Sequence, residues 1–124
     1  MPSPRDRGSA EEDRAAQHLR DRGYLVVARN WHSRFGEIDI IARDGPVLAF
    51  VEVRSRAGTG FGGAAASVGP AKRARIVLAA RAYIAMEGVD PELPLRFDVV
   101  ALEGDDVVVH RDAFQVDDRC SHGF

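Results

Sequence analysis

Residues 35–56 read FGEIDIIARDGPVLAFVEVRSR, in which two apolar β-type runs flank the turn signal Asp44-Gly45. An Asp-Gly pair between apolar runs is a strong signal for an antiparallel hairpin. Two acidic residues, Asp39 and Glu52, lie inside these runs, where a charge is unfavourable unless another group pairs with it. We therefore expect a well-packed hairpin that holds both carboxylates close to a cation.

The turn fixes which residues of the hairpin are neighbours. If Asp44-Gly45 closes a tight turn, Asp39 lies opposite Phe50, and Glu52 is its diagonal neighbour at roughly 7 to 8 Å. Arg54 joins the same face because the side chains of a strand alternate with a period of two. The other face would form a core surface from Ile38, Ile40, Ala42, Val47, Ala49, Val51 and Val53.

A polar cluster of this composition suits a divalent metal. Mg²⁺ takes carboxylate and carbonyl oxygens and keeps several waters, which matches Asp39, Glu52 and the Val53 carbonyl. The alternative is a hairpin with one solvated face, on which Arg54 forms an incidental ion pair with Glu52 or Asp39. The pattern therefore predicts an Mg²⁺ or Mn²⁺ site, or else a wet sheet surface.

Short motifs along most of the chain resemble one family. They are Gly23-Tyr24, Arg29-Asn30, Gly36-Glu37-Ile38-Asp39, Phe50-Val51-Glu52-Val53-Arg54, Phe61-Gly62, Lys72 and Arg96-Phe97-Asp98-Val99-Val100. In order and spacing they resemble the YraN-like family of uncharacterised bacterial proteins over about residues 8–102. An acid in a hairpin followed by Glu-x-Lys or Glu-x-Arg also resembles the PD-(D/E)xK nuclease superfamily. The resemblance implies a restriction-endonuclease-like α/β fold, similar to archaeal Holliday-junction resolvases, and DNA endonuclease activity.

Two further glutamates have competing interpretations. Glu12 lies on the apolar stripe of the first predicted helix, so its carboxylate would point toward the sheet. The resemblance implies that a glutamate at this place helps to bind the metal. Alternatively, Glu12 closes a capping box with the backbone N–H of Ser9. Glu37, predicted directly opposite Glu52, is either an auxiliary acid or part of the turn at Gly36.

Arg54 departs from the superfamily pattern, in which this position is usually lysine. Arginine keeps the positive charge but does not deprotonate in proteins, so it stabilises a phosphate without acting as a base. Lys72 at the start of the second predicted helix would supply the amine, unless it is an ordinary first-turn lysine. The predicted catalytic residues are thus Asp39, Glu52, Arg54 and Lys72, with Asp39, Glu52, Val53 and Glu12 at the metal.

The distribution of charge favours a nucleic-acid partner, although the net charge is −2. Residues 1–81 contain 14 Lys and Arg against 9 Asp and Glu, whereas residues 82–124 contain 3 against 10. The basic excess therefore accompanies the acidic hairpin, as expected if a phosphate backbone crosses it. Arg56, Arg73 and Arg75 are predicted to bind DNA, with a solvated helix charge as the alternative for Arg75.

The chain is predicted to form one domain of residues 9–113, after a disordered leader (1–8) and before a loose polar tail (114–124). The expected elements are a helix at 9–22, strands at 24–29 and on both sides of the hairpin turn, a glycine-rich loop at 58–63, a helix from Pro70 to near Gly88, and strands at 96–102 and 107–110 after an Asp105-Asp106 turn. This order, α-β-β-β-α-β-β, predicts a central mixed sheet flanked by helices.

No apolar run approaches the length of a membrane span, and residues 1–7 lack the apolar centre of a secretory signal, so a cytoplasmic location is predicted. The predicted function is hydrolysis of phosphodiester bonds in DNA, on branched or repair intermediates, with Mg²⁺ or Mn²⁺. Two alternatives stay open: a DNA-binding or adaptor protein without activity, and a protein-interaction module that uses the acidic half. Related resolvases act as dimers, which would make this protein a homodimer.

Overall fold

The computed structural model describes residues 4–56 and 68–116, with side chains from Ala10 to Ser55 and from Val68 to Val116. Its elements are α1 (Pro4–Asp21), β1 (Leu25–Ser33), β2 (Gly36–Asp44), β3 (Val47–Arg56), α3 (Pro70–Met86), β4 (Leu95–Glu103) and β5 (Asp106–Phe114). The predicted α/β class and the order α-β-β-β-α-β-β are confirmed. The predicted glycine-rich loop at 58–63 and the tail from residue 117 onward lie outside the described residues.

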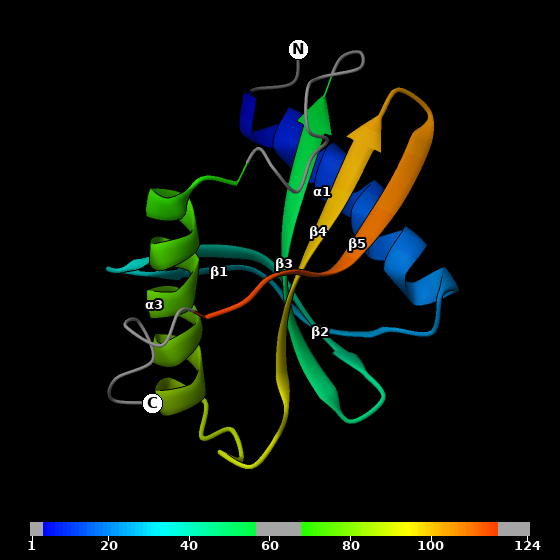
Figure 1. Cartoon of the computed structure of the whole chain (residues 1–124). Helices are drawn as coiled ribbons and strands as arrows, with labels where there is room; N and C mark the ends of the chain where they lie inside the picture. The colour runs from blue at the N-terminus through cyan, green and yellow to red at the C-terminus, as the bar shows by residue number, and fades with distance from the viewer. Residues whose placement is uncertain (1–3, 57–67, 117–124) are drawn as a thin grey trace.

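The five strands form one sheet in the order β1-β2-β3-β4-β5. The β3–β4 pair is parallel and the other three pairs are antiparallel, so the sheet is mixed as predicted. Helix α3 lies between β3 and β4 in the chain, in agreement with the crossover that a parallel pair requires. Figure 1 shows α1 and α3 on opposite sides of this sheet.

Each helix covers one apolar face of the sheet. On the α3 side, Tyr83 contacts Phe50 edge to face at a centroid distance of 6.0 Å, and Phe97 stacks on Phe50 and on Phe114. On the α1 side, Leu19 packs with Ile40, Ala42, Ala49, Val51, Val100 and Leu102. Burial of both faces explains why β3 and β4 read as nearly continuous apolar runs.

Helix α1 begins at Pro4 rather than at Ser9, and so includes residues 4–8 of the predicted leader. Proline suits a first helical turn because its φ is already helical and an N–H is not needed there. Ser9 lies inside the helix, so the predicted capping box with Glu12 is wrong. No helix in the described part of the chain is long and apolar enough to cross a membrane.

The β2–β3 turn differs from the prediction. Asp44 pairs with Val47, so the turn residues are Gly45 and Pro46 instead of Asp44-Gly45. Gly45 has φ +59°, which the first position of a type I′ or II′ turn requires. Pro46 has no N–H to offer the strand ladder and is therefore better placed in the turn. The β2–β3 turn is thus one residue later than predicted, whereas the β4–β5 turn is one residue earlier, since Glu103 pairs with Asp106.

The new register changes which residues are neighbours but keeps each side chain on its face, because the shift is two residues. Phe50 pairs with Ile41, and the ladder between β2 and β3 begins at Ile40 and Val51, next to Asp39 and Glu52. The predicted pairing of Asp39 with Phe50 is therefore wrong. The predicted pairing of Glu37 with Glu52 belonged to the same register and is not found, and Glu37 pairs with His32 of β1.

The apolar face of the hairpin is mostly as predicted, with one exception. Ile40, Ala42, Ala49 and Val51 are buried toward α1, with Val53 packed against them. Ile38 instead belongs to the cluster under α3, so the strand alternation breaks between Ile38 and Ile40. Asn30 on the neighbouring strand has φ +52°. Irregular backbone is thus concentrated around Asp39.

Candidate functional site

An acidic pair lies where β2 and β3 face the first turns of α3. Asp39 comes from β2 and Glu52 from β3, and the Val53 N–H donates a hydrogen bond to Asp39 Oδ2 at 2.8 Å. Glu52 is only 6% exposed. The hairpin therefore holds a buried and a partly buried carboxylate together, on the face that the sequence indicated.

The surroundings make ionisation of Asp39 unfavourable. Burial raises its pKa first, the negative charge of Glu52 and a hydrogen bond with Glu52 raise it further, and the Val53 N–H opposes them; the result is a pKa of about 7. Two carboxylates that share a site behave in this way because like charges disfavour full ionisation. A divalent cation between them would remove that repulsion.

Two basic side chains contact Glu52 from different elements. Lys72 Nζ, on the first turn of α3, lies 2.8 Å from Glu52 Oε1. Arg54 Nη1, on β3, lies 3.8 Å from the same oxygen. Lys72 thus reaches from α3 to the sheet. The two cations place positive charge at the edge of the acidic pair, where a phosphate group would need it.

The acidic pair opens into a cavity of about 290 Å³, lined by Gly36, Glu37, Asp39, Glu52, Lys72, Arg75 and Ile76. The cavity lies between α3 and the start of β2. A Cβ atom on Gly36 would be 3.5 Å from the Arg75 carbonyl oxygen, and its φ of +147° already favours glycine. Glu37 lies at the rim and pairs with His32 at 3.2 Å. The backbone conformation therefore favours glycine at position 36, whereas the contact with α3 would leave room for a Cβ atom.

The donor set fits a hard divalent ion. Among the described residues, no group of three or more His, Cys, Asp and Glu is placed to hold a metal. Asp39 and Glu52 therefore form a two-carboxylate set, which suits Mg²⁺ because this ion commonly binds one or two carboxylates and keeps its other waters. Mn²⁺ prefers the same oxygen ligands. The Val53 carbonyl stays a predicted ligand.

Glu12 is held by an arginine that sequence reasoning did not consider. Its carboxylate is buried, and its Oε1 accepts a hydrogen bond from Arg29 Nε at 3.1 Å. Burial raises the pKa of Glu12, while Arg29 lowers it. The charge of Glu12 is close enough to raise the pKa of Asp39, but the two are not joined with Glu52 in a three-ligand group. The Arg29-Asn30 motif in the sequence was the available signal for Arg29 as the partner of Glu12.

The three arginines predicted to bind DNA differ in their surroundings. Arg75 is exposed and lines the cavity. Arg73 donates from Nε to the Val68 carbonyl at 2.7 Å, and its guanidinium lies 5.4 Å from the Phe114 ring centroid. The Arg56 side chain lies outside the described part of the structure. Of the two that are described, Arg75 is therefore the better placed to meet a phosphate backbone.

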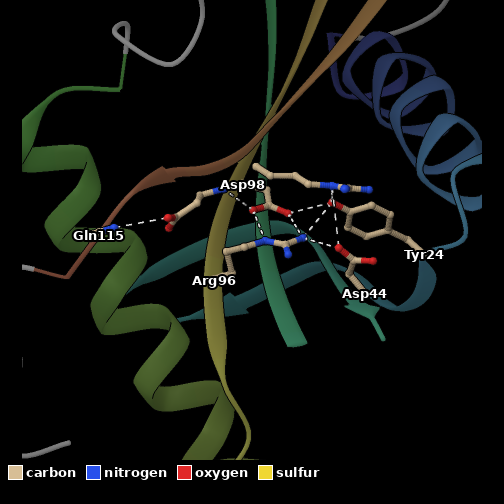
Figure 2. A network of polar contacts seen from close by, with 7 residues as sticks. Tyr24, Asp44, Arg96, Asp98 and Gln115 are labelled. Carbon is tan, nitrogen blue, oxygen red and sulfur yellow. Dashed lines mark hydrogen bonds and ion pairs between the residues drawn. The ribbon is translucent and has the colours of Figure 1, made fainter. Parts of the chain in front are cut away.

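A second polar network lies at the other end of the hairpin (Figure 2). The Asp98 carboxylate is fully buried and accepts two hydrogen bonds from Arg96, at 2.8 and 2.9 Å, and one from the Tyr24 hydroxyl at 3.0 Å. Arg96 also donates to Asp44 Oδ2 at 2.8 Å. A β-bulge opposite Asp98 turns the Asp112 N–H toward it, at 2.9 Å. This network connects Tyr24, which precedes β1, with β2, β4 and β5.

Sequence reasoning missed this network, although a signal existed. Asp98 interrupts an apolar strand in the same way as Asp39 and Glu52 do. A charge in a buried strand requires a partner, and the neighbouring Arg96 is two residues away on the same face.

Comparison with known proteins places the chain in a family. The family model described as "Uncharacterised protein family UPF0102" matches residues 11–102. The chain belongs to the UPF0102 family. It is 53% identical over 118 residues to UPF0102 protein RALTA_A3032 of Cupriavidus taiwanensis, covering 94% of this chain and 88% of that protein. It is 47% identical over 121 residues to UPF0102 protein xcc-b100_3645 of Xanthomonas campestris pv. campestris, covering 95% and 99%.

Membership of UPF0102 confirms the YraN-like relationship that the motifs indicated. The matched segment includes Glu12, Asp39, Glu52, Arg54 and Lys72. The acidic cavity therefore lies wholly in the part of the chain that defines the family.

Proposed function

We propose that this UPF0102 protein is a DNA endonuclease that hydrolyses phosphodiester bonds with Mg²⁺ or Mn²⁺ held by Asp39 and Glu52. The observation that carries the proposal is the convergence of Asp39, Glu52 and Lys72 at one cavity, with Arg54 paired to Glu52. Acids that hold a divalent ion, next to cations that hold a phosphate, are the groups needed for metal-assisted phosphodiester hydrolysis.

Each residue has a distinct task in this mechanism. A bound divalent ion supplies Lewis acidity at the phosphate and lowers the pKa of water. Asp39 and Glu52 hold that ion, and Lys72 and Arg54 offset the negative charge that develops on the phosphate in the transition state. Arg54 does not accept a proton from water, since its guanidinium stays charged. Arg75 at the cavity rim positions the DNA backbone, with Arg73 and Arg56 as further predicted contacts.

Branched recombination or repair intermediates are the proposed substrates, and a homodimer the proposed assembly, because a junction offers two equivalent strands to a two-fold symmetric protein. The predicted cytoplasmic location stays a prediction. The second proposed function is a DNA-binding or adaptor protein without turnover. One observation favours it: Arg54 stands at the position where the nuclease pattern has lysine.

Turnover separates these two functions. Purified protein is incubated with a panel of branched, nicked, single-stranded and duplex DNAs in Mg²⁺ and in Mn²⁺. We expect cleavage of at least one substrate by the wild type and none by Glu52→Gln, which keeps the shape of the side chain but removes the metal-binding charge. If both proteins show the same trace cleavage on every DNA, the activity is a contaminant and the binding function is favoured.

Arg54→Lys is expected to keep or increase cleavage, whereas Arg54→Ala should lower kcat by on the order of 10²-fold, as for the loss of one preorganised electrostatic contact. Lys72→Ala should have a similar effect because it removes the cation nearest to Glu52. The assay is single-turnover cleavage at saturating metal. An Arg54→Ala variant that cleaves at the wild-type rate would show that this charge does not act on the phosphate.

The surroundings of Arg75 and Arg73 lead to a prediction for DNA binding. Arg75→Ala should reduce the slope of log affinity against log salt concentration by about one unit, since one phosphate contact is lost. Arg73→Ala should instead reduce stability, because it removes the hydrogen bond to Val68 and the contact with Phe114. Fluorescence anisotropy titrations at several salt concentrations measure the slope. A larger change in slope for Arg73→Ala than for Arg75→Ala would mean that Arg73, and not Arg75, contacts the phosphate.

A further inference from the structure

A second cavity adjoins the acidic one along α3. It has a volume of about 470 Å³ and is lined by Ser33, Arg34, Phe35, Ala82, Ala85 and Met86. This volume is within the roughly 300 to 1,000 Å³ of pockets that hold small organic groups. In Figure 1 the β1–β2 turn, in cyan, lies next to α3, whose last turns form the other wall of this cavity.

The two cavities follow one another along both elements that line them, the segment around Phe35 and Gly36 and helix α3. Phe35 lines the second cavity and its neighbour Gly36 lines the first. On α3, Ile76 belongs to the first cavity and Ala82 to the second, a separation of about 9 Å along a helix that rises about 1.5 Å per residue. That is about two to three steps of a stacked nucleic-acid strand, which rises about 3.4 Å per nucleotide along its axis.

The second cavity presents an aromatic ring and a cation in a fixed turn. Phe35 is 41% exposed, and the Arg34 guanidinium carbon lies 4.9 Å from the centroid of its ring. Ser33 Oγ accepts a hydrogen bond from the Phe35 N–H at 3.1 Å and donates one to the Gly36 carbonyl at 3.0 Å. The turn therefore holds Phe35 at the surface, where it lines the cavity together with Met86, which is 71% exposed.

We propose that this second cavity receives an unpaired nucleobase of the DNA strand whose phosphate occupies the acidic cavity. The proposal rests on the nuclease function proposed above and specifies its substrate class. The apolar walls and the Phe35 ring suit the face of a base, and the exposed Arg34 and Arg75 suit the phosphates on either side of it. A base inside a duplex has both faces covered by its neighbours and cannot stack on Phe35. DNA with an unpaired nucleotide close to a branch or an end offers both the uncovered base face and the phosphates on either side of it.

The test compares the binding of two DNAs that differ only in pairing. A labelled duplex, and the same duplex with a short single-stranded flap, are titrated with full-length protein in EDTA, so that no cleavage occurs and anisotropy reports affinity. The wild type should prefer the flap DNA. Phe35→Ala should weaken flap binding by roughly 5- to 150-fold, the range for loss of one base-stacking contact, while duplex affinity changes by less than about twofold.

Three further variants separate stacking from a general loss of apolar surface. Phe35→Trp should keep the preference for flap DNA because it keeps an aromatic face, and Phe35→Leu should lose it although it stays apolar. Leu25→Ala is the matched control, since Leu25 is an exposed apolar residue, 68% accessible, on the outer strand β1. It should leave both affinities unchanged. All four side chains replace exposed groups, so the fold is retained.

Several results would overturn the base-binding proposal: a wild type without preference, an equal loss on both DNAs for Phe35→Ala, or full retention by Phe35→Leu. A shift from dimer to monomer in sedimentation of Phe35→Ala, with DNA preference intact, would assign the cavity to a second copy of the chain. These outcomes are independent of turnover. If Glu52→Gln abolishes cleavage but Phe35→Ala has no effect on DNA preference, only the base-binding proposal is wrong. If the wild type and Glu52→Gln show equal trace cleavage, only the nuclease proposal is wrong.

Discussion

Asp39→Asn is expected to abolish Mn²⁺ binding in calorimetry and to lower metal-dependent cleavage by more than the roughly 10- to 100-fold that is typical for residues around a metal ligand. The physical reason is that one of two carboxylates in the donor set loses its charge, while the shape of the side chain is kept. Retention of wild-type Mn²⁺ affinity by this variant would place the metal elsewhere or remove it from the function.

The same substitution should stabilise the metal-free protein above neutral pH. The pKa of Asp39 is about 7 in the folded protein, against an ordinary 3.8. A raised pKa means that the favourable contribution of this carboxyl is complete below about pH 4 and is lost as the pH rises to 7. Asparagine has no charge to bury, and its amide can accept from the Val53 N–H and donate to Glu52.

Urea unfolding in EDTA measures this effect. At pH 8 the Asp39→Asn variant should exceed the wild type in free energy of unfolding by on the order of 1 to 3 kcal/mol, and the difference should shrink as the pH falls toward 4. Glu37→Gln is the matched control, because Glu37 lines the same cavity but its side chain is 64% exposed. A wild type that is more stable than Asp39→Asn at pH 8 would mean that the acidic pair is not strained without metal.

Asp98→Ala is expected to cause the largest loss of stability, about 3 kcal/mol or more in the free energy of unfolding. It removes a fully buried carboxylate and leaves the Arg96 guanidinium, the Tyr24 hydroxyl and the Asp112 N–H without their shared acceptor. A buried cation that loses one of its partners costs more than the pair contributed, since its desolvation is no longer offset.

Asp44→Ala provides the comparison for Asp98. Asp44 also contacts Arg96 at 2.8 Å, but its side chain is 25% exposed, so the loss should be about 1 kcal/mol. Unfolding in urea for both single variants and the double variant gives the coupling between the two carboxylates through Arg96. Equal losses for Asp44→Ala and Asp98→Ala would show that burial does not control the strength of this network.

The hairpin shows which structural features short-range sequence patterns can predict. Apolar alternation placed Asp39 and Glu52 on one face, and the structure brings them together, because the two-residue period does not depend on the turn. The predicted turn, Asp44-Gly45, lies one residue before the observed turn, Gly45-Pro46. The prediction followed the Asp-Gly signal, although Pro46 has no N–H for the strand ladder and is better placed in the turn. The error left Asp39 and Glu52 at one cavity.

Interactions between distant parts of the chain were not predictable in the same way. The role of Glu12 was open because its partner Arg29 lies 17 residues away on another element. Tyr24 and Asp98 are 74 residues apart, and no spacing rule connects them. Such pairs depend on how α1 and β4 pack on the sheet, which is decided by the burial of whole faces.

The sequence by itself determined the order of helices and strands, the mixed sheet and the acidic face of the hairpin, because periodicity, proline, glycine and turn residues act within a few positions of the chain. Only the tertiary structure decided that Lys72 contacts Glu52, that Arg29 holds Glu12 and that Asp98 is held by Arg96 and Tyr24. A buried charge requires a partner, and local sequence states that requirement, but the identity of the partner is fixed only when distant elements are packed together.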